Sequence, residues 1–164
     1  MENFVNPLIM SILFLSTGIV GNIFACCFSD FDTPSIGAST AIFGIFGAMG
    51  GFVLLNWHKL PADQKGYMVC IVAFIIIMNL LFGLGTSISS NKNSSNDILA
   101  HVGGLLAGAF LGMVICEMRN VPSQNKVWEK RVKLIGIILF TTYFLLVTLG
   151  VFVFRSNSPK PVFK

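Results

Sequence analysis

Charged residues are scarce in this sequence, which limits the kinds of protein that it can encode. Only 11% of its 164 residues are Asp, Glu, Lys or Arg, whereas 54% are hydrophobic. A soluble domain carries about 25% charged residues, so this chain has too few to cover a globular fold with polar surface. The net charge of +4 falls mostly in short segments between apolar runs, where it reflects orientation in a bilayer. The sequence therefore predicts a membrane protein and gives no sign of a nucleic-acid partner.

Metal-binding patterns are lacking as well. No Cys-x-x-Cys pair is present, and neither of the two histidines stands at ligand spacing from a cysteine. This argues against a zinc site or a disulfide framework, and no cofactor or metal is expected. Four cysteines lie within or at the end of apolar runs, where we expect them to be buried as small apolar residues; they are Cys26, Cys27, Cys70 and Cys116.

Five apolar runs make up most of the chain. Each is close to the ~20 residues that a helix needs to cross a hydrocarbon core of about 30 Å. Lipid leaves a separate spanning segment no other way to satisfy its backbone, so all five should be helices. The expected fold class is an all-α membrane protein, a polytopic bundle of five transmembrane helices. The runs cover residues 7–28, 37–57, 67–84, 98–116 and 134–154.

Basic residues predict the orientation of these helices. Residues 58–66 contain two Lys or Arg and residues 117–133 contain five, whereas residues 29–34 contain none and residues 86–97 contain one. Lys and Arg concentrate in cytoplasmic loops, so the two basic segments, 58–66 and 117–133, should face the cytoplasm. The polar segment 86–97 is expected to be a mobile loop on the outer side. The first run is not expected to be a signal peptide, because no Lys or Arg precedes it.

One apolar stretch, residues 35–51, combines many glycines with a serine at its polar entrance. On a helical wheel, Phe43, Phe46 and Gly50 fall on the face of this serine, Ser39. Because Ser39 follows a proline and opens a helix, a simple N-capping role is the alternative to a chemical one.

A second stretch carries a histidine inside a hydrophobic run. Ionisable residues within a membrane segment are costly and usually functional, which draws attention to His101. Gly104, Gly108 and Gly112 share its helix face, and such a groove of small residues lets two helix backbones approach closely. The alternative is a neutral histidine that only packs against a neighbouring helix.

These two stretches are expected to bring Ser39 and His101 together. Both residues lie a few positions inside the outer end of helices that run in the same direction, so they should sit at similar depth. Phe43 offers a ring against which the imidazole could stack. The start of the serine helix also supplies backbone N–H groups that could stabilise an oxyanion.

The two stretches around Ser39 and His101 resemble the rhomboid family of intramembrane serine proteases. The segment GASTAIFG at residues 37–44 is similar to the family pattern G-x-S-G-x-x-[FY]-G. The segment AHVGGLLAG at residues 100–108 is similar to its pattern A-H-x-x-G-x-x-x-G. The resemblance extends over about residues 7–116.

The resemblance implies a serine endopeptidase that cleaves transmembrane segments of other membrane proteins with a Ser–His dyad. Ser39 would be the nucleophile, His101 the general base and acid, and Phe43 the aromatic support of the imidazole. Residues 67–84 would form a side entrance for substrate and residues 86–97 its cover. Four further residues would serve oxyanion binding through the backbone and helix packing: Gly37, Ala38, Gly104 and Gly108.

Two departures from the family pattern stand out. Thr40 occupies the position of a family glycine, and the family's second helix, with its H-x-x-x-N pair, has no counterpart here. We therefore expect a partial rhomboid-like transmembrane domain at residues 1–154 that lacks two N-terminal helices. Residues 134–154 would be an extra C-terminal helix, and residues 155–164 a short polar tail. The expected location is a multi-pass position in a membrane, either an endomembrane or the plasma membrane if the organism is eukaryotic.

Two alternatives remain open from the sequence. The first is a catalytically inactive rhomboid-like protein that binds transmembrane segments, which Thr40 and the missing helices favour but the intact Ser39 and His101 do not. The second is a transporter or channel component, for which Asn56 and Asn79 would be the other strongly polar residues in the middle runs.

Overall fold

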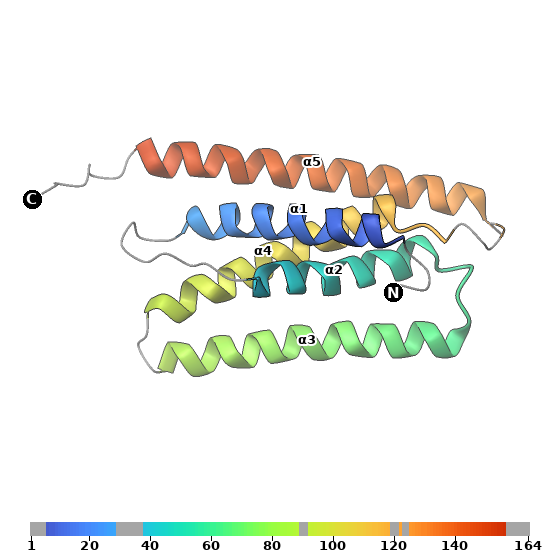
Figure 1. Ribbon diagram of the computed structural model, residues 1–164, viewed down its shortest axis with the longest axis horizontal. Coiled ribbons are helices and arrows are strands. Elements are labelled where there is room, and N and C mark those ends of the chain that lie inside the picture. The colour runs from blue at the N-terminus through green and yellow to red at the C-terminus, as the bar shows by residue number, and fades with distance from the viewer. Residues whose placement is uncertain (1–5, 29–37, 89–91, 119–121, 123–124, 157–164) are drawn as a thin grey trace, which may run out of the picture.

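Five α-helices make up the part of the chain that the structure describes. The computed structural model describes residues 6–28, 38–88, 92–118, 122 and 125–156, and no strand occurs in these ranges. Figure 1 shows the helices side by side along one long axis, with α3 and α5 at opposite edges of the view. The helices are α1 (Pro7–Cys26), α2 (Ser39–Leu55), α3 (Ala62–Ile88), α4 (Lys92–Ile115) and α5 (Lys126–Ser156).

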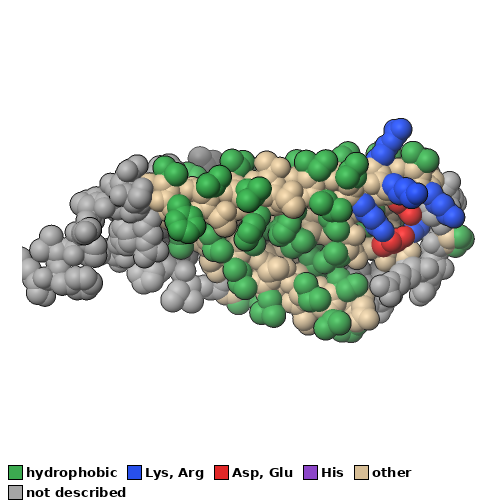
Figure 2. Space-filling model, turned by 90° about the horizontal axis from the view of Figure 1, so that it is seen from above, with side chains coloured by type: hydrophobic (Ala, Val, Ile, Leu, Met, Phe, Trp, Pro, Cys, Tyr) green, Lys and Arg blue, Asp and Glu red, His purple; other side chains and the backbone are tan. Residues whose placement is uncertain are grey.

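The helix lengths and composition suit a bilayer. Four helices (α1, α3, α4 and α5) are long and apolar enough to cross a membrane, and α2 is a shorter apolar helix of 17 residues. Exposed apolar side chains cover much of the surface in Figure 2, whereas Lys, Arg, Asp and Glu gather at one end. The chain is therefore a multi-pass membrane protein with an all-α fold, as the sequence predicted.

Local sequence sets where the first helix begins. Asn6 caps α1 by accepting a hydrogen bond from the backbone N–H of Leu8 (2.9 Å). Pro7 takes the first helical position, where its missing N–H costs nothing and its fixed φ suits the helix. These two residues account for the start of the helix at the predicted position.

Glycines allow α2 to lie in direct backbone contact with α4. A Cβ added at Gly112 would come within 2.5 Å of the Ala48 carbonyl oxygen, and one added at Gly108 would overlap the carbonyl oxygen of Gly44. From the other helix, a Cβ at Gly51 would lie 2.6 Å from the backbone nitrogen of Met113. The histidine-bearing face of α4 is thus the face that packs on α2, and only small residues permit this approach.

The first helix closes the third side of this core. A Cβ added at Gly21 of α1 would lie 2.6 Å from the backbone nitrogen of Gly104 in α4, and Gly44 of α2 faces the side chain of Thr17. Thr17 is fully buried, and its hydroxyl donates to the Leu13 carbonyl oxygen (2.7 Å) within the same helix. Helices α1, α2 and α4 therefore form the packed centre, and α3 and α5 lie outside it (Figure 1).

Several predicted helix boundaries are wrong. Residues 86–97 were expected to be a loop, but α3 continues to Ile88 and α4 begins at Lys92. The helix α5 likewise begins at Lys126, eight residues before its apolar run. Apolar runs mark only the part of a helix inside hydrocarbon, whereas an established helix continues at little cost into polar sequence outside it.

The prediction that all four cysteines are buried is wrong for two of them. Cys116 is buried and Cys27 is half-buried, but Cys26 and Cys70 are exposed on the helix surface. A cysteine within an apolar run can face lipid as readily as the protein interior, because both surroundings are apolar.

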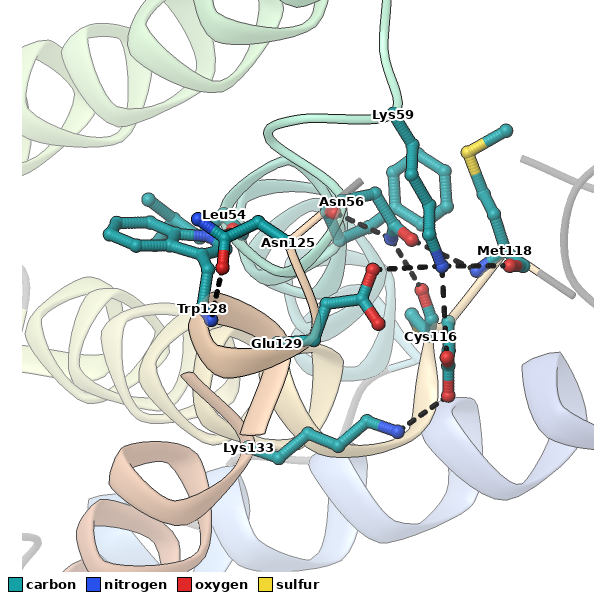
Figure 3. A network of polar contacts seen from close by, with 11 residues as sticks. Leu54, Asn56, Lys59, Cys116, Met118, Asn125, Trp128, Glu129 and Lys133 are labelled. Atoms are coloured by element: carbon teal, nitrogen blue, oxygen red, sulfur yellow. Dashed lines mark hydrogen bonds and ion pairs between the residues drawn. The ribbon is translucent and has the colours of Figure 1, made fainter. Parts of the chain in front are cut away.

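A polar network ties the ends of α2, α4 and α5 together at the end of the bundle opposite Ser39 (Figure 3). The amide of Asn56, 1% exposed, donates to the Cys116 carbonyl oxygen (2.8 Å) and accepts from the backbone N–H of Met118 (2.9 Å). Lys59, whose side chain is 2% exposed, lies 3.0 Å from a carboxylate oxygen of Glu129 and 3.7 Å from one of Glu117. Asn56, one of the residues considered for a transport path, instead satisfies backbone groups beyond the end of α4.

Acid should weaken this network at a defined carboxyl group. The hydrogen bond from Lys133 is the largest cause that lowers the pKa of Glu117 below its ordinary value of 4.5, and the charges of Lys133 and Lys59 act in the same direction. A group with a lowered folded-state pKa contributes stability above its unfolded pKa and loses it as the pH falls through the folded value. We expect the unfolding temperature in detergent to drop as the pH falls from about 6 to below about 4.5.

The variant Glu117→Gln should unfold at a lower temperature than the unmodified chain near neutral pH, where the ionised carboxylate contributes its stability, and should therefore show a smaller drop in acid. Replacement of the exposed Asp63 by Asn is the matched control for the loss of one carboxylate. An acid-induced drop of the same size in Glu117→Gln and in the unmodified chain would contradict this role of Glu117.

Candidate functional site

Ser39 is the first residue of α2, and its side chain is exposed. The N-cap residue is Ala38, whose side chain makes no capping hydrogen bond. The sequence had suggested either an N-cap or a position a few residues inside the helix, and both are corrected by this placement. The amides of the first helical turn have no intrahelical acceptor, so backbone N–H donors lie beside the serine hydroxyl.

His101 lies on α4, and its imidazole faces the start of α2. The Nε2 atom is 3.0 Å from the Oγ atom of Ser39, within hydrogen-bond distance. On the other side of the ring, Nδ1 is 3.2 Å from Oδ1 of Asn79 in α3. Because α4 begins at Lys92, His101 lies about 14 Å along its helix, not a few residues inside it. The two side chains therefore meet although they occupy different positions along their own helices.

Phe43 supports the imidazole from one face. Its ring lies one helical turn after Ser39 and stacks on His101 with centroids 4.2 Å apart and an interplanar angle of 15°. Stacking of this kind restricts rotation of the imidazole about its side-chain bonds. The ring is thus held between Phe43 on its face and two hydrogen-bonding groups on its edge.

The glycines predicted to serve the site lie beneath it. Gly104 packs against the carbonyl oxygen of Thr40, and Gly108 packs against that of Gly44 one turn deeper. Both are buried, so they set the distance between α2 and α4 from which the two side chains reach each other. Ala38 is exposed next to Ser39, and Gly37 lies outside the described residues.

Thr40 points away from the serine hydroxyl. Its side chain is 2% exposed, and its hydroxyl donates to Oδ1 of Asn22 in α1 (3.3 Å). Its methyl group would lie 2.5 Å from a Cβ added at Gly21 and 3.1 Å from one added at Gly104. The threonine therefore fills the junction of α1, α2 and α4.

The arrangement has the parts of a serine nucleophile activated by histidine. An imidazole nitrogen at hydrogen-bond distance from a hydroxyl can take its proton as the oxygen attacks an electrophile. Of the acidic residues whose side chains the structure describes, Asp63, Glu117 and Glu129 all belong to the opposite end of the bundle. Within that part of the chain, the amide of Asn79 occupies the place that the third member of a Ser–His–Asp triad would take, beside Nδ1 of the histidine.

Comparison with known proteins gives the family. The family model for the Rhomboid domain matches residues 1–118. The chain belongs to the rhomboid family. Among curated proteins, it is 38% identical over 103 residues to "RHOMBOID-like protein 7" of Arabidopsis thaliana, a match covering 63% of this chain and 29% of the relative.

Two further relatives in the rhomboid family carry protease names. "Rhomboid protease GluP" of Bacillus subtilis is 38% identical over 102 residues, or 62% of this chain and 18% of the relative. "Rhomboid-like protease 1" of Toxoplasma gondii is 29% identical over 127 residues, or 77% of this chain and 41% of the relative. The chain thus spans less than half the length of each of these relatives, and no solved structure gives a significant match.

Two polar residues near the site were missed as site residues by sequence reasoning. Asn79 was considered only for a transport path, and Asn22 was not singled out. Each is a strongly polar residue in an otherwise apolar run, which is the signal that could have drawn attention to them. Their contacts with His101 and Thr40 depend on the rotation of α3 and α1 about their axes, which the sequence pattern leaves undefined.

Proposed function

We propose that this rhomboid-family chain carries the nucleophile and the general base of an intramembrane serine endopeptidase. The observation that supports it is the 3.0 Å separation of Ser39 Oγ and His101 Nε2 at the start of α2. The stacked Phe43 and the protease names among the relatives favour the same activity. The substrates would be transmembrane segments of other membrane proteins, with no cofactor needed.

In the proposed reaction the proton of Ser39 passes to Nε2 of His101 as Oγ bonds to the carbonyl carbon of the scissile peptide. The protonated imidazole then gives that proton to the amide nitrogen as the C–N bond breaks. A water molecule, deprotonated by the same nitrogen, attacks the acyl group and releases it from Ser39. The backbone N–H groups of the first turn of α2 are the donors available for the developing oxyanion.

The proposed domain comprises residues 1–154, in which α5 lies beyond the matched Rhomboid domain. This helix is anchored at its start by Glu129 and Lys133 and packs on α4, where Gly136 approaches Met113 and Val114. It is therefore an addition on the outside of the packed centre. The site itself is built from α2, α3 and α4.

A fluorophosphonate probe tests the proposal directly. Attack of Ser39 Oγ on phosphorus forms an O–P bond and releases fluoride, so a labelled chain reports an activated serine. We expect the chain in detergent micelles to be labelled on Ser39, with the site identified by mass spectrometry. The variant Ser39→Ala should not be labelled.

Two outcomes would count against the proposal. A chain that stays unlabelled while an active rhomboid protease reacts under the same conditions would favour the binding of transmembrane segments without cleavage. Labelling that persists in Ser39→Ala would place the reactive group elsewhere in the chain.

A further inference from the structure

We propose that Asn79 is a positioning residue that holds His101 in the tautomer able to accept the proton of Ser39. This inference rests on the proposed function, because it assigns the amide a role in the same Ser–His pair. In this arrangement the amide oxygen of Asn79 accepts the Nδ1–H of His101, and the lone pair of Nε2 faces the serine hydroxyl.

The first support is the geometry around the imidazole. Oδ1 of Asn79 lies 3.2 Å from Nδ1, while Oγ of Ser39 lies 3.0 Å from Nε2, so the ring bridges the two polar groups. Phe43 stacks on the ring face and leaves only its edge for hydrogen bonds. Rotation of the ring would break both contacts at once.

The second support is the burial of Asn79. It is 5% exposed, and it is the one buried residue among the described side chains of α3, residues 62–81. Its neighbours on that helix face outward, such as Ile77 at 52% and Leu80 at 57% exposed. A lone inward amide on a lipid-facing helix is costly unless it makes a hydrogen bond, and the imidazole is the partner that the structure provides.

The chemical consequence follows from the two tautomers of a neutral imidazole. A general base needs an unprotonated nitrogen toward the serine, which requires the hydrogen on Nδ1. An acceptor at Nδ1 stabilises this form, in the way that the carboxylate of a Ser–His–Asp triad fixes its histidine. An amide oxygen can supply the same acceptor without placing a charge in the membrane.

The tautomer can be measured without any enzyme activity. The chain has two histidines, so replacement of the exposed His58 by Gln leaves His101 as its single imidazole. With ¹⁵N-labelled histidine at about pH 8, where an ordinary imidazole is neutral, the nitrogen chemical shifts report which atom carries the hydrogen. We expect Nδ1–H in this chain and a loss of that preference in the additional variant Asn79→Leu.

Two substitutions of Asn79 separate positioning from packing. Asn79→Leu keeps the volume but removes the acceptor, so fluorophosphonate labelling of Ser39 should slow by on the order of 10–100-fold. Asn79→Asp keeps an acceptor toward Nδ1, so it should label at least several-fold faster than Asn79→Leu. A role in packing alone predicts the reverse order, because a buried carboxylate disrupts an apolar helix contact more than leucine does. The control Leu80→Ala on the same helix should label at the normal rate.

Different results overturn the inference and the proposed function. Nε2–H as the resting form of His101 would overturn the positioning role, whether or not the chain is labelled. Equal labelling rates for Asn79→Leu and the unmodified chain would overturn it as well. Absence of labelling together with an Nδ1–H histidine would instead count against the protease activity and leave the hydrogen bond of Asn79 standing.

Discussion

Replacing His101 by Ala is expected to slow the acylation of Ser39 by at least about 10³-fold, because the serine hydroxyl loses the base that takes its proton. The hydroxyl would then have only water as a proton acceptor, although the backbone donors at the start of α2 would remain. The measurement is the second-order rate constant for fluorophosphonate labelling, compared with that of the unmodified chain in the same detergent.

The other histidine of the chain supplies the matched control. His58 is exposed between α2 and α3, at the end of the bundle remote from Ser39, and its ring meets that of Trp128 edge-on with centroids 5.5 Å apart. His58→Ala removes the same type of side chain and should leave the labelling rate unchanged. A labelling rate in His101→Ala within tenfold of the unmodified chain would exclude His101 as the base.

Replacing Gly108 by Ala is expected to destabilise the bundle by about 3 kcal/mol, near the upper end for an overpacked interior. The added methyl group would overlap the carbonyl oxygen and carbon of Gly44, which belong to the backbone of α2 and cannot rotate away. Relief requires α2 and α4 to move apart along their whole contact. The measurement is unfolding by SDS or heat in mixed micelles, followed by helix content.

Gly50 offers the same substitution without the overlap. A Cβ there would meet only Val72 Cγ1, at the ordinary contact distance of 3.8 Å. Gly50→Ala should change stability by no more than about 1 kcal/mol, the usual difference in helix propensity. Equal stability of the two variants would mean that the close approach of α2 and α4 is not what holds the bundle together.

Much of the bundle could be predicted from the sequence because lipid simplifies the rules. Every backbone group of a spanning segment must be satisfied within a helix, so apolar runs near the right length translate into helices. The pairing of Ser39 with His101 was also expected, because each lies on a glycine-bearing face and the two helices run in the same direction.

The ends of the helices were less predictable. The starts of α4 at Lys92 and α5 at Lys126 lie in polar sequence, where hydropathy carries no signal. As a result, the position of His101 along its helix was predicted wrongly, although its pairing with Ser39 was expected. Position along a helix depends on where the helix begins, and that depends on contacts outside the hydrocarbon region.

The surroundings of Asn79 and Thr40 could not be predicted for a different reason. Helix α3 is apolar around most of its circumference, so its sequence does not indicate which face turns inward. Thr40 differs from the family's glycine, and sequence alone suggested crowding around the serine. Its buried contact with Asn22 instead depends on how α1 and α2 are rotated against each other.

The shortness of α2 has a consequence for the depth at which chemistry would occur. Its 17 residues extend over about 26 Å, less than the ~30 Å thickness of a typical hydrocarbon layer. The neighbouring α3 and α4 are longer, with 27 and 24 residues, and extend beyond the first turn of α2 in Figure 1. Ser39, as the first residue of α2, therefore lies short of the ends of α3 and α4 along the long axis of the bundle. A helix shorter than the hydrocarbon layer is accommodated at a cost that grows with the mismatch, so bilayer thickness is a variable that should act on the end of α2 where Ser39 lies.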